Sequence, residues 1–394
     1  KRCWPAEVEA IEAFLLSQAE FRHNVITHHC EIRWTEEAGF LPLTDRDVNT
    51  LWGRMNKTVG RVYLTDIYNV IHSEFVPLFN PFQSYFDHLP SWDGVSDPIG
   101  DLADTVHVKS DQAEFRDYFR KWFVGILPAL LDDTVVNHEI LVLIGEQGLY
   151  KTTWFNFLLP PELRCYFYTK TNSDRLNKDD LFSLTEFALI CFEELDGMRP
   201  AELNQLKAMV TMPYVNERAA YGRNKERHPH IASFCGTGNN VQFLTDPTGN
   251  RRWLPFEVSQ IRDPHLHAIP YELVYSQAYA LWKSGFCHWF SQEEIRVLNT
   301  HNSRFEVPNL EEDLIRTHFR KPFEGETGIF VTAADILEQI SSCLRYPLSP
   351  NKIGRIMAGL EFESIRYRGK RGYVTVKKTG EDIDRERRSG ALGL

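Results

Sequence analysis

Three stretches of the chain each pass from a short apolar run into a polar loop, a pattern typical of strands in a parallel sheet. The apolar runs lie at 139–144, 187–192 and 231–236, and segments with helical spacing of apolar residues separate them. Strands that are apolar at every position are buried on both faces, as in a sheet with helices on each side. The pattern from 139 to about 258 therefore predicts an α/β core with a parallel sheet.

The segment before this core predicts a small α-rich domain. Helical spacing covers 6–22 and runs again from Thr44 to about Val76, while 30–34 and 39–43 have the pattern of short strands. Proline and glycine residues then indicate a turn-rich linker, so we expect the α-rich region and its linker to occupy residues 1–100.

Further helical patterns surround the core, over about 112–131 and over 264–300, where aromatic residues predict a packed lid more than a base-stacking surface. We expect the whole core to span 101–300. The end of the chain has two capped helix starts, at Thr332 and Ser349, followed by a hairpin pattern. Two helices and a hairpin predict a winged-helix-like module over 301–380 and leave a flexible tail at 381–394.

The loop after the first apolar run has the residues of a phosphate-binding loop. Gly145 and Lys151 have the expected spacing, but Tyr150 stands where a glycine is usual, so Gly148 would supply the freedom of the loop. Helix N-termini bind phosphate, the lysine can reach the outer phosphates, and the Thr152 hydroxyl suits Mg²⁺. The alternative is a chance strand and helix with an incidental Lys-Thr pair. The predicted nucleotide-binding residues are Gly145, Glu146, Gln147, Gly148, Leu149, Tyr150, Lys151, Thr152 and Thr153.

Polar residues also follow the other two apolar runs: paired carboxylates after the second, and paired amides and then paired arginines after the third. A triphosphatase needs one acid for Mg²⁺, one acid to polarise the attacking water, an amide to orient it, and a guanidinium to neutralise charge. The alternative is that the acids are solvated and the arginines pair at the surface. The predicted catalytic residues are Glu193, Glu194, Asn239, Asn240, Arg251 and Arg252, and the predicted metal ligands are Thr152 and Glu193.

The net charge of −10 does not favour nucleic-acid binding, so any DNA contact must be local. One basic cluster lies in an expected hairpin with its tip near 223–226, and a denser one lies in the hairpin pattern of 365–378. The alternatives are a solvated loop for the first and a subunit-packing module for the second. The predicted DNA-binding residues are Arg223, Lys225, Arg227, Arg366, Arg368, Lys370 and Arg371.

Other features exclude several classes of protein. Seven scattered cysteines without C-x-x-C spacing argue against a disulfide framework or a zinc ribbon, and adjacent His28, His29 and Cys30 fit a surface loop better than a metal site. No apolar stretch approaches the roughly 20 residues of a membrane span, and no leader pattern is visible, so we expect a cytoplasmic protein. The chain begins at Lys1 and not at Met, as a fragment of a longer protein would.

Taken in order, these motifs resemble the virulence-associated protein E family, whose members are similar to superfamily 3 helicases of the AAA+ class. The resemblance covers roughly 75–260, with departures at Tyr150 and at Cys191, where relatives often carry a further acid. The residues that carry it are Gly145-Glu-Gln-Gly, Lys151-Thr, Glu194-Leu-Asp, Lys207, Arg218, Tyr221-Gly, Gly236-Thr-Gly-Asn and Thr248-Gly-Asn-Arg-Arg-Trp.

The resemblance implies a helicase that hydrolyses ATP with Mg²⁺ between the subunits of a homo-oligomeric ring, a hexamer. It implies a collar at the N-terminus, a pore hairpin that grips single-stranded DNA, and an arginine, Arg251 or Arg252, that reaches the adjacent subunit. Duplex DNA and a primase are further expected partners, in the replication of a phage or mobile element. A nucleotide-dependent switch or scaffold that does not unwind DNA, for instance in defence, is the main alternative, and a small-molecule kinase is a weaker one.

Overall fold

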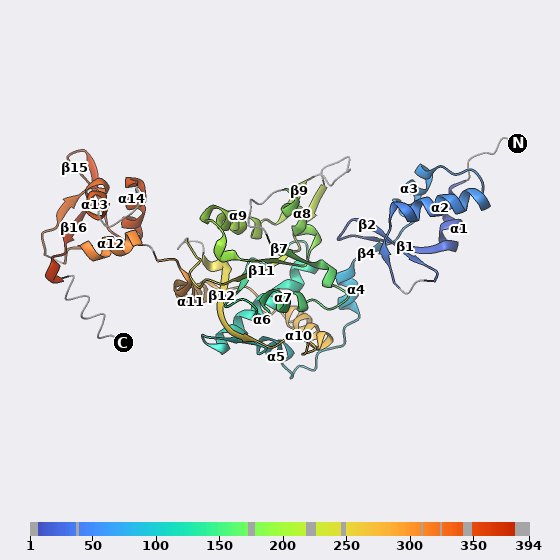
Figure 1. The fold of residues 1–394 in the computed structure, drawn as a ribbon, viewed down its shortest axis with the longest axis horizontal. Helices are drawn as coiled ribbons and strands as arrows, with labels where there is room; N and C mark the ends of the chain where they lie inside the picture. The colour runs from blue at the N-terminus through green and yellow to red at the C-terminus, as the bar shows by residue number, and fades with distance from the viewer. Residues whose placement is uncertain are drawn as a thin grey trace. The chain divides into compact units, whose positions relative to one another are not determined.

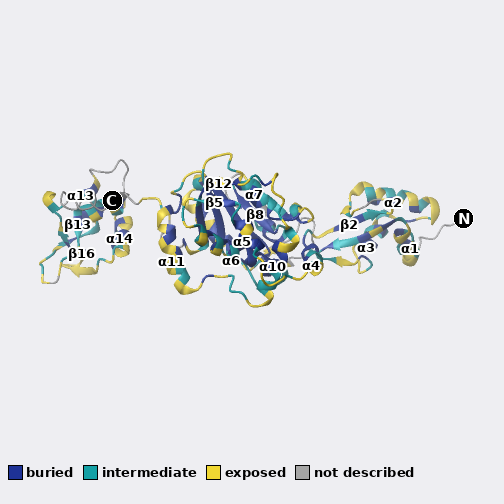
Figure 2. Ribbon diagram, turned by 90° about the horizontal axis from the view of Figure 1, so that it is seen from below, coloured by how far each residue is buried: buried dark blue, intermediate teal, exposed yellow. Residues whose placement is uncertain are grey.

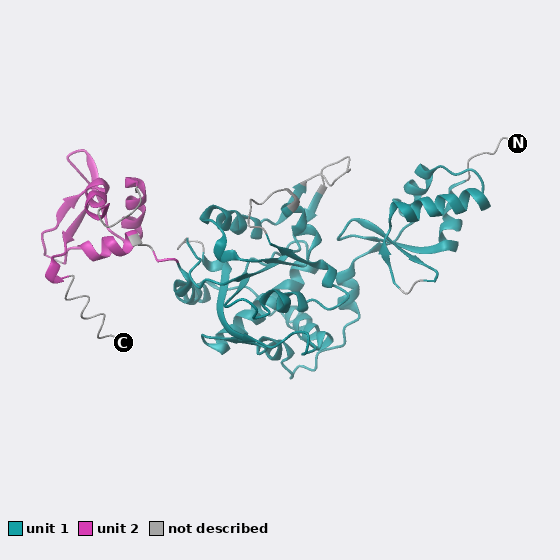
Figure 3. Cartoon of the chain, in the orientation of Figure 1, with its two compact units in different colours: residues 1–306 teal, residues 307–394 magenta. Residues whose placement is uncertain are grey.

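The computed structural model describes residues 7–36, 39–171, 178–217, 226–245, 250–308, 310–323, 325–341 and 349–382. The chain divides into two compact units, residues 1–306 and 307–394, which are coloured separately in Figure 3. Both units mix helices and strands, and Figure 1 labels their elements. Among the described residues, no helix combines the length and the apolar character that crossing a membrane requires.

The first unit begins with a four-stranded sheet of order β3-β2-β1-β4 and three helices, which enclose a small core of their own. The helix expected over 6–22 ends at Gln18, because Ala19 and Phe21 are buried on one face of a strand that pairs along its length with β2. The elements are α1 (Val8–Gln18), β1 (Ala19–Asn24), β2 (His29–Trp34), β3 (Leu41–Pro42), α2 (Asp45–Thr58), α3 (Leu64–Ile71) and β4 (Leu78–Phe79).

The rest of the first unit is built on a six-stranded sheet of order β5-β12-β6-β11-β8-β7. The five strands from β12 to β7 are parallel, as the apolar runs predict, and only β5 pairs antiparallel. Its strands are β5 (Val106–Val108), β6 (Ile140–Ile144), β7 (Phe167–Lys170), β8 (Leu189–Phe192), β11 (Ser233–Gly238) and β12 (Trp253–Ile261).

Helices surround this sheet, and a separate hairpin of two strands follows α9. The hairpin pairs β9 (Tyr214–Glu217) antiparallel with β10 (Glu226–Pro229). The helices are α4 (Pro81–Asp87), α5 (Pro98–Ala103), α6 (Gln112–Leu131), α7 (Lys151–Phe157), α8 (Lys178–Glu186), α9 (Pro200–Val210), α10 (Tyr271–Lys283) and α11 (Gln292–Asn302), with short 3₁₀ turns η1 (Arg164–Tyr166), η2 (Leu195–Gly197), η3 (Asn250–Arg252) and η4 (Ser303–Phe305).

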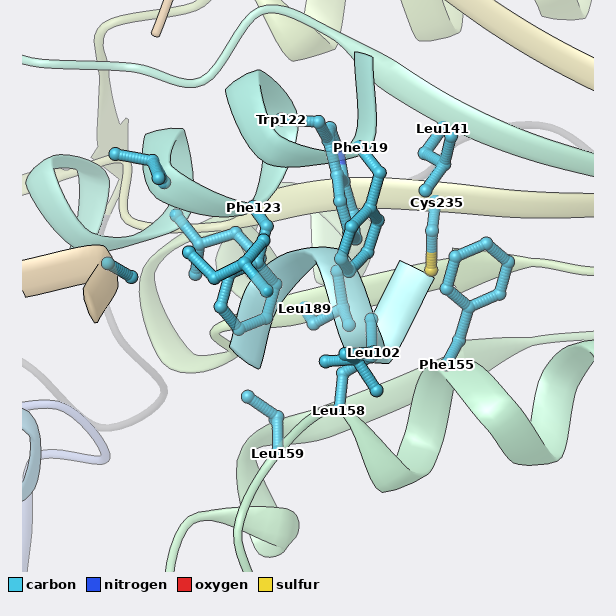
Figure 4. Close-up of a cluster of buried hydrophobic side chains, with 14 of the residues drawn as sticks. Leu102, Phe119, Trp122, Phe123, Leu141, Phe155, Leu158, Leu159, Leu189 and Cys235 are labelled. Carbon is cyan, nitrogen blue, oxygen red and sulfur yellow. The ribbon is translucent and has the colours of Figure 1, made fainter. Parts of the chain in front are cut away.

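Alternate residues of β6 explain why the sheet is buried on both faces. Leu141 and Leu143 pack into a cluster with α6, α7 and α10, whereas Ile140, Val142 and Ile144 pack into a second cluster with α8 and α9. The two sets of helices lie on opposite sides of the sheet in Figure 1, and Figure 2 shows the strands of the sheet in the dark blue of buried residues. Figure 4 shows the first cluster, where aromatic side chains of α6 meet Leu141 and Cys235 from the sheet. The sheet is therefore a rigid support for the loops at its edges.

The second unit has its own core and ends in a hairpin. Helices α12, α13 and α14 pack around Ile315, Ile336 and Ile353, and β16 pairs antiparallel with β13, β14 and β15. The expected caps are present, because Thr332 Oγ1 accepts from the Asp335 N–H and Ser349 Oγ accepts from the Lys352 N–H. The elements are α12 (Leu310–His318), β13 (Phe319–Arg320), β14 (Ile329–Val331), α13 (Ala333–Ser341), α14 (Pro350–Gly359), β15 (Ser364–Tyr367) and β16 (Lys370–Lys377).

Candidate nucleotide-binding site

The loop between β6 and α7 is fixed at its start by the neighbouring strands. The Gly145 N–H donates to the Gly238 carbonyl on β11 at 3.1 Å. A side chain at Gly145 would place its Cβ only 2.8 Å from the Val258 carbonyl oxygen on β12, so only glycine fits there. The sheet thus holds the loop at the carboxyl edge of the parallel strands, where such sheets bind ligands.

Tyr150 adopts the backbone conformation that glycine usually provides at this position. Its φ of 59° and ψ of 17° are left-handed, and Gly148 also has a positive φ, of 84°. The expectation that Gly148 alone supplies the freedom of the loop is therefore incomplete, since both residues turn the chain. The Tyr150 carbonyl accepts the Trp154 N–H at 2.7 Å, so the strained residue also starts helix α7.

Lys151 begins α7 and turns back over the loop. Its Nζ donates to the carbonyl oxygens of Gly145, at 2.6 Å, and Glu146, at 2.7 Å, and lies 3.4 Å from Asn239 Oδ1. Burial lowers the pKa of Lys151, and the charge of nearby Asp196 opposes that effect. A buried ammonium held only by carbonyl oxygens is poorly compensated, which favours an anion as a further partner.

The paired acids lie directly opposite helix α7. Thr152 Oγ1 donates to Glu193 Oε1 at 2.7 Å, so a hydroxyl and a carboxylate meet at one point. Glu194 has a left-handed φ of 55° and is exposed. These hard oxygen donors suit Mg²⁺, which takes few protein ligands and relies on phosphates and water for the rest. Among the described residues, no group of three or more His, Cys, Asp or Glu is placed to hold a metal without such help.

Asp196 is a residue of this site that the sequence analysis did not assign. Its two carboxylate oxygens accept the N–H groups of Asn239, at 3.2 Å, and Asn240, at 3.0 Å. The carboxylate therefore ties the turn after β8 to the end of β11. The only sequence signal was its position two residues after Glu194 in the acidic strand end.

The two asparagines differ in what their side chains do. Asn239 lines the same cavity as the loop and faces Lys151, whereas Asn240 Oδ1 accepts the Gln242 N–H at 3.1 Å in a local turn. Strand β11 lies between β6 and β8, which places Asn239 between the loop and the acids. The geometry therefore favours Asn239 over Asn240 as the residue that meets a ligand.

These residues surround a cavity of about 350 Å³. Gly145 and Glu146 contribute the carbonyl groups that hold Lys151 and are not part of the lining, and Cys191 is buried inside β8. The cavity is lined by Gln147, Gly148, Leu149, Tyr150, Lys151, Thr152, Thr153, Glu193, Glu194, Thr237, Gly238 and Asn239. One cavity thus combines the predicted loop, both acids and one of the amides.

Arg251 and Arg252 lie at the opposite edge of the sheet. They directly precede β12, whose first residue, Trp253, pairs with Ile140 at the start of β6, whereas the loop follows Ile144 at its end. A strand rises about 3.3 Å per residue, so the length of β6 separates the arginines from Lys151 of the same chain. The structure does not bring the predicted arginines and the predicted loop together within one chain.

The arginines border a second cavity, of about 390 Å³, together with Glu139 and the apolar side chains of Trp289 and Phe290. Arg251 is exposed. The Arg252 Nε atom is buried, and no residue in the described ranges accepts a hydrogen bond from it. Burial raises the pKa of Glu139 to about 7, against the opposing charges of Lys121 and Arg251. This edge therefore carries a cationic cluster with little neutralising charge.

The basic residues predicted to contact DNA lie in two places. Arg227 is on β10, with its guanidinium 3.7 Å from the centre of the Tyr214 ring on β9, so it braces the hairpin. Arg223 and Lys225, at the predicted tip, lie outside the described residues. On the other hairpin, four basic residues are exposed on β15, the turn and β16: Arg366, Arg368, Lys370 and Arg371.

Comparison with known proteins gives a family match. The sequence pattern of the virulence-associated protein E-like domain matches residues 87–307, which is more than half of the chain. No curated protein matches. Among solved structures, the chain is similar to the apo structure of the NrS-1 C-terminal region, with a TM-score of 0.49 and 13% identity over 94% of this chain and 99% of that chain. Two A form apo structures of the NrS-1 C-terminal region have TM-scores of 0.46 and 0.47, at 13% and 11% identity and the same coverage.

Proposed function

The chain belongs to the virulence-associated protein E-like family, and we propose that it is an ATP-hydrolysing DNA helicase of superfamily 3 type that serves replication of a phage or mobile element. The observation that carries this proposal is the contact between Thr152 Oγ1 and Glu193 Oε1, at 2.7 Å, in the cavity that also holds Lys151. A hydroxyl, a carboxylate and an ammonium around one loop are the groups that phosphoryl transfer requires.

Five polar side chains of the cavity have proposed roles in this reaction. Thr152 and Glu193 would hold Mg²⁺, which neutralises phosphate charge when it is bound. Lys151 would exchange the carbonyls of Gly145 and Glu146 for the outer phosphates. Glu194 would accept a proton from the attacking water, and Asn239 would orient that water. Asp196 positions Asn239 through its backbone N–H.

The distance between the arginines and the loop of the same chain supports catalysis at a subunit interface. If the subunits form a ring head to tail, the edge of the sheet that carries Arg251 meets the cavity of the next subunit. Arg251 is exposed and can reach a neighbour, whereas Arg252 is partly buried. We therefore favour Arg251 as the arginine finger. We propose that the subunits form a homo-oligomeric ring, a hexamer, and the separation of the arginines from the loop supports this assembly.

DNA contact is proposed at both hairpins. The hairpin of β9 and β10 would face the pore of the ring and bind single-stranded DNA, and Arg227 would support it. The order of elements in the second unit, with α13 and α14 before the hairpin of β15 and β16, supports a winged-helix-like module that binds DNA. A primase is a further partner consistent with replication.

The main alternative is a nucleotide-dependent switch that does not unwind DNA. ATP turnover measured with and without single-stranded DNA separates the two functions. A helicase should turn over ATP faster with the strand, and Lys151→Ala should lower turnover by at least about 100-fold because phosphate charge loses its cation. ATP turnover that is unchanged by single-stranded DNA would favour the switch. ATP turnover that requires a small molecule to accept the phosphoryl group would favour a kinase. Lys57→Ala, on the surface of α2, is the matched control.

A further inference from the structure

The hairpin of β15 and β16 ends in a turn that costs conformational energy. Tyr367 pairs with Lys370, which leaves only Arg368 and Gly369 in the turn. Both have positive φ, 49° and 78°, which is the geometry of a tight hairpin turn. Glycine adopts such a φ freely, but a residue with a side chain does so only at a cost in conformational energy. An arginine at this position is therefore better explained by what it binds than by the turn itself.

One face of this hairpin carries an aromatic pair. Tyr367 on β15 and Phe330 on β14 have ring centroids 5.4 Å apart, with an interplanar angle of 52°. Gly372 makes this contact possible, because a Cβ there would lie 2.6 Å from the Phe330 ring. Tyr367 is nevertheless 51% exposed, and the Arg368 guanidinium lies 5.3 Å from its ring centre. The tip of the hairpin thus presents an aromatic ring beside a planar cation.

Basic residues lie on both faces of the hairpin: Arg366 and Arg371 share the face opposite the aromatic pair, whereas Lys370 lies across from Tyr367 on the aromatic face. Arg366 pairs directly with Arg371 across the two strands, and like charges opposite each other destabilise a sheet. In the described part of the chain, no carboxylate forms an ion pair with Arg366, Arg368, Lys370 or Arg371. A polyanion is the partner that would compensate this arrangement, and the aromatic pair beside it requires a partner with flat apolar surfaces as well.

We propose that Tyr367, supported by Phe330 and flanked by Arg368, stacks on an unpaired base, so that the hairpin binds a single DNA strand and not only the backbone of a duplex. This inference rests on the proposed DNA-binding function of the second unit and specifies single-stranded DNA as its ligand. In a single strand, a base can leave its stack and lie on the ring while the neighbouring phosphates meet Arg368, beside the ring, and Lys370, across from it. In a duplex, the bases are stacked on one another and cannot reach Tyr367.

Binding of the 394-residue chain to a labelled 20-nucleotide thymidine strand, an abasic strand of the same length and a duplex tests this proposal. Tyr367→Leu keeps an apolar contact with Phe330 but removes the aromatic face. It should weaken binding to the thymidine strand by about 5-fold or more, because stacking contributes roughly 1–3 kcal/mol per base. Its binding to the abasic strand and to the duplex should stay as in the wild type, and Tyr367→Phe should bind all three normally.

Tyr63→Leu is the matched control. Tyr63, in the first unit, is exposed to a similar extent, at 49%, and the centre of its ring lies 5.1 Å from the Arg61 guanidinium carbon. A photoreactive 5-iododeoxyuridine in the strand should also crosslink to Tyr367. Equal loss on the abasic strand, or unchanged binding to the thymidine strand with no crosslink at Tyr367, would overturn the stacking role. If the wild type binds none of the three DNAs, the proposed function itself fails, which is a different result.

Discussion

At the scale of single residues, Tyr150 shows how the loop after β6 reaches a left-handed backbone without the glycine that its proposed phosphate-binding role would favour. The position calls for a left-handed backbone, which glycine provides freely, and Tyr150 adopts it with φ of 59°. Tyr150 is 42% exposed and lines the cavity. The loop therefore needs a left-handed backbone at position 150, but it does not need glycine there. The side chain of Tyr150 can contact a ligand in the cavity.

This account predicts different outcomes for two substitutions at Tyr150. Tyr150→Gly should change the free energy of unfolding by no more than about 1 kcal/mol, because relief of strain offsets the added freedom of the unfolded chain. Tyr150→Val should lower it by about 1–3 kcal/mol and reduce ATP turnover, because a β-branched residue resists the left-handed conformation. Thermal unfolding and turnover of both variants measure this. A Tyr150→Val variant with the same free energy of unfolding as the unsubstituted protein would contradict backbone strain at this position.

Substitutions should also distinguish the roles of the two acids at the end of β8, Glu193 and Glu194. Glu193 accepts the Thr152 hydroxyl and Glu194 does not share that contact, so we assign the metal to the first and the water to the second. Glu194→Gln should bind ATP normally and hydrolyse it about 100-fold to 10,000-fold more slowly. Glu193→Gln should instead raise the Mg²⁺ concentration needed for binding. Reversed phenotypes would exchange the two roles.

At the scale of elements, the sequence predicts the strands that are buried on both faces better than those at an edge. Strands β6, β8 and β11 are buried at every position, and the runs at 139–144, 187–192 and 231–236 locate them within two residues. Strand β1 was expected as helix because its polar residues, such as Arg22, hide the alternation of Ala19 and Phe21. Asp196 was missed for a related reason: its partners are backbone N–H groups on another strand, which no local pattern reveals.

The second unit is predicted to bind DNA separately from catalysis. Deletion of residues 307–394 removes a unit with its own core, so ATP turnover without DNA should be largely unchanged. Duplex binding should weaken, and its dependence on salt should become less steep by about 3 to 4 units of slope, since the four hairpin cations predicted to contact phosphates are among the residues removed. Removing two exposed cations of the first unit, with Lys57→Ala and Arg61→Ala, should leave that slope unchanged. Unchanged duplex affinity after the deletion would assign the unit to packing.

At the scale of the whole molecule, the arrangement of the sheet decides which predicted residues can act together. The loop and the acids follow the carboxyl ends of β6 and β8, and they meet in one cavity. Arg251 and Arg252 precede the start of β12, which pairs with β6 in parallel, so they lie at the other edge. Sequence order alone cannot reveal this separation, because it depends on a pairing between strands more than 100 residues apart. The same separation makes a second subunit necessary if an arginine is to complete the site.

The central claim, hydrolysis of ATP between subunits, is tested most directly by ATP turnover in mixtures of two inactive variants. Lys151→Ala lacks a working cavity, and Arg251→Ala lacks the finger, whose loss should cost roughly 1,000-fold or more in turnover. In random assemblies of equal amounts, about a quarter of the interfaces pair an intact cavity with an intact arginine, so turnover should recover to roughly that fraction of the wild type. Arg252→Ala in the same mixture shows whether the neighbouring arginine has this role instead. If the subunits exchange and neither mixture recovers activity, the arginines do not act across an interface and the claim is wrong.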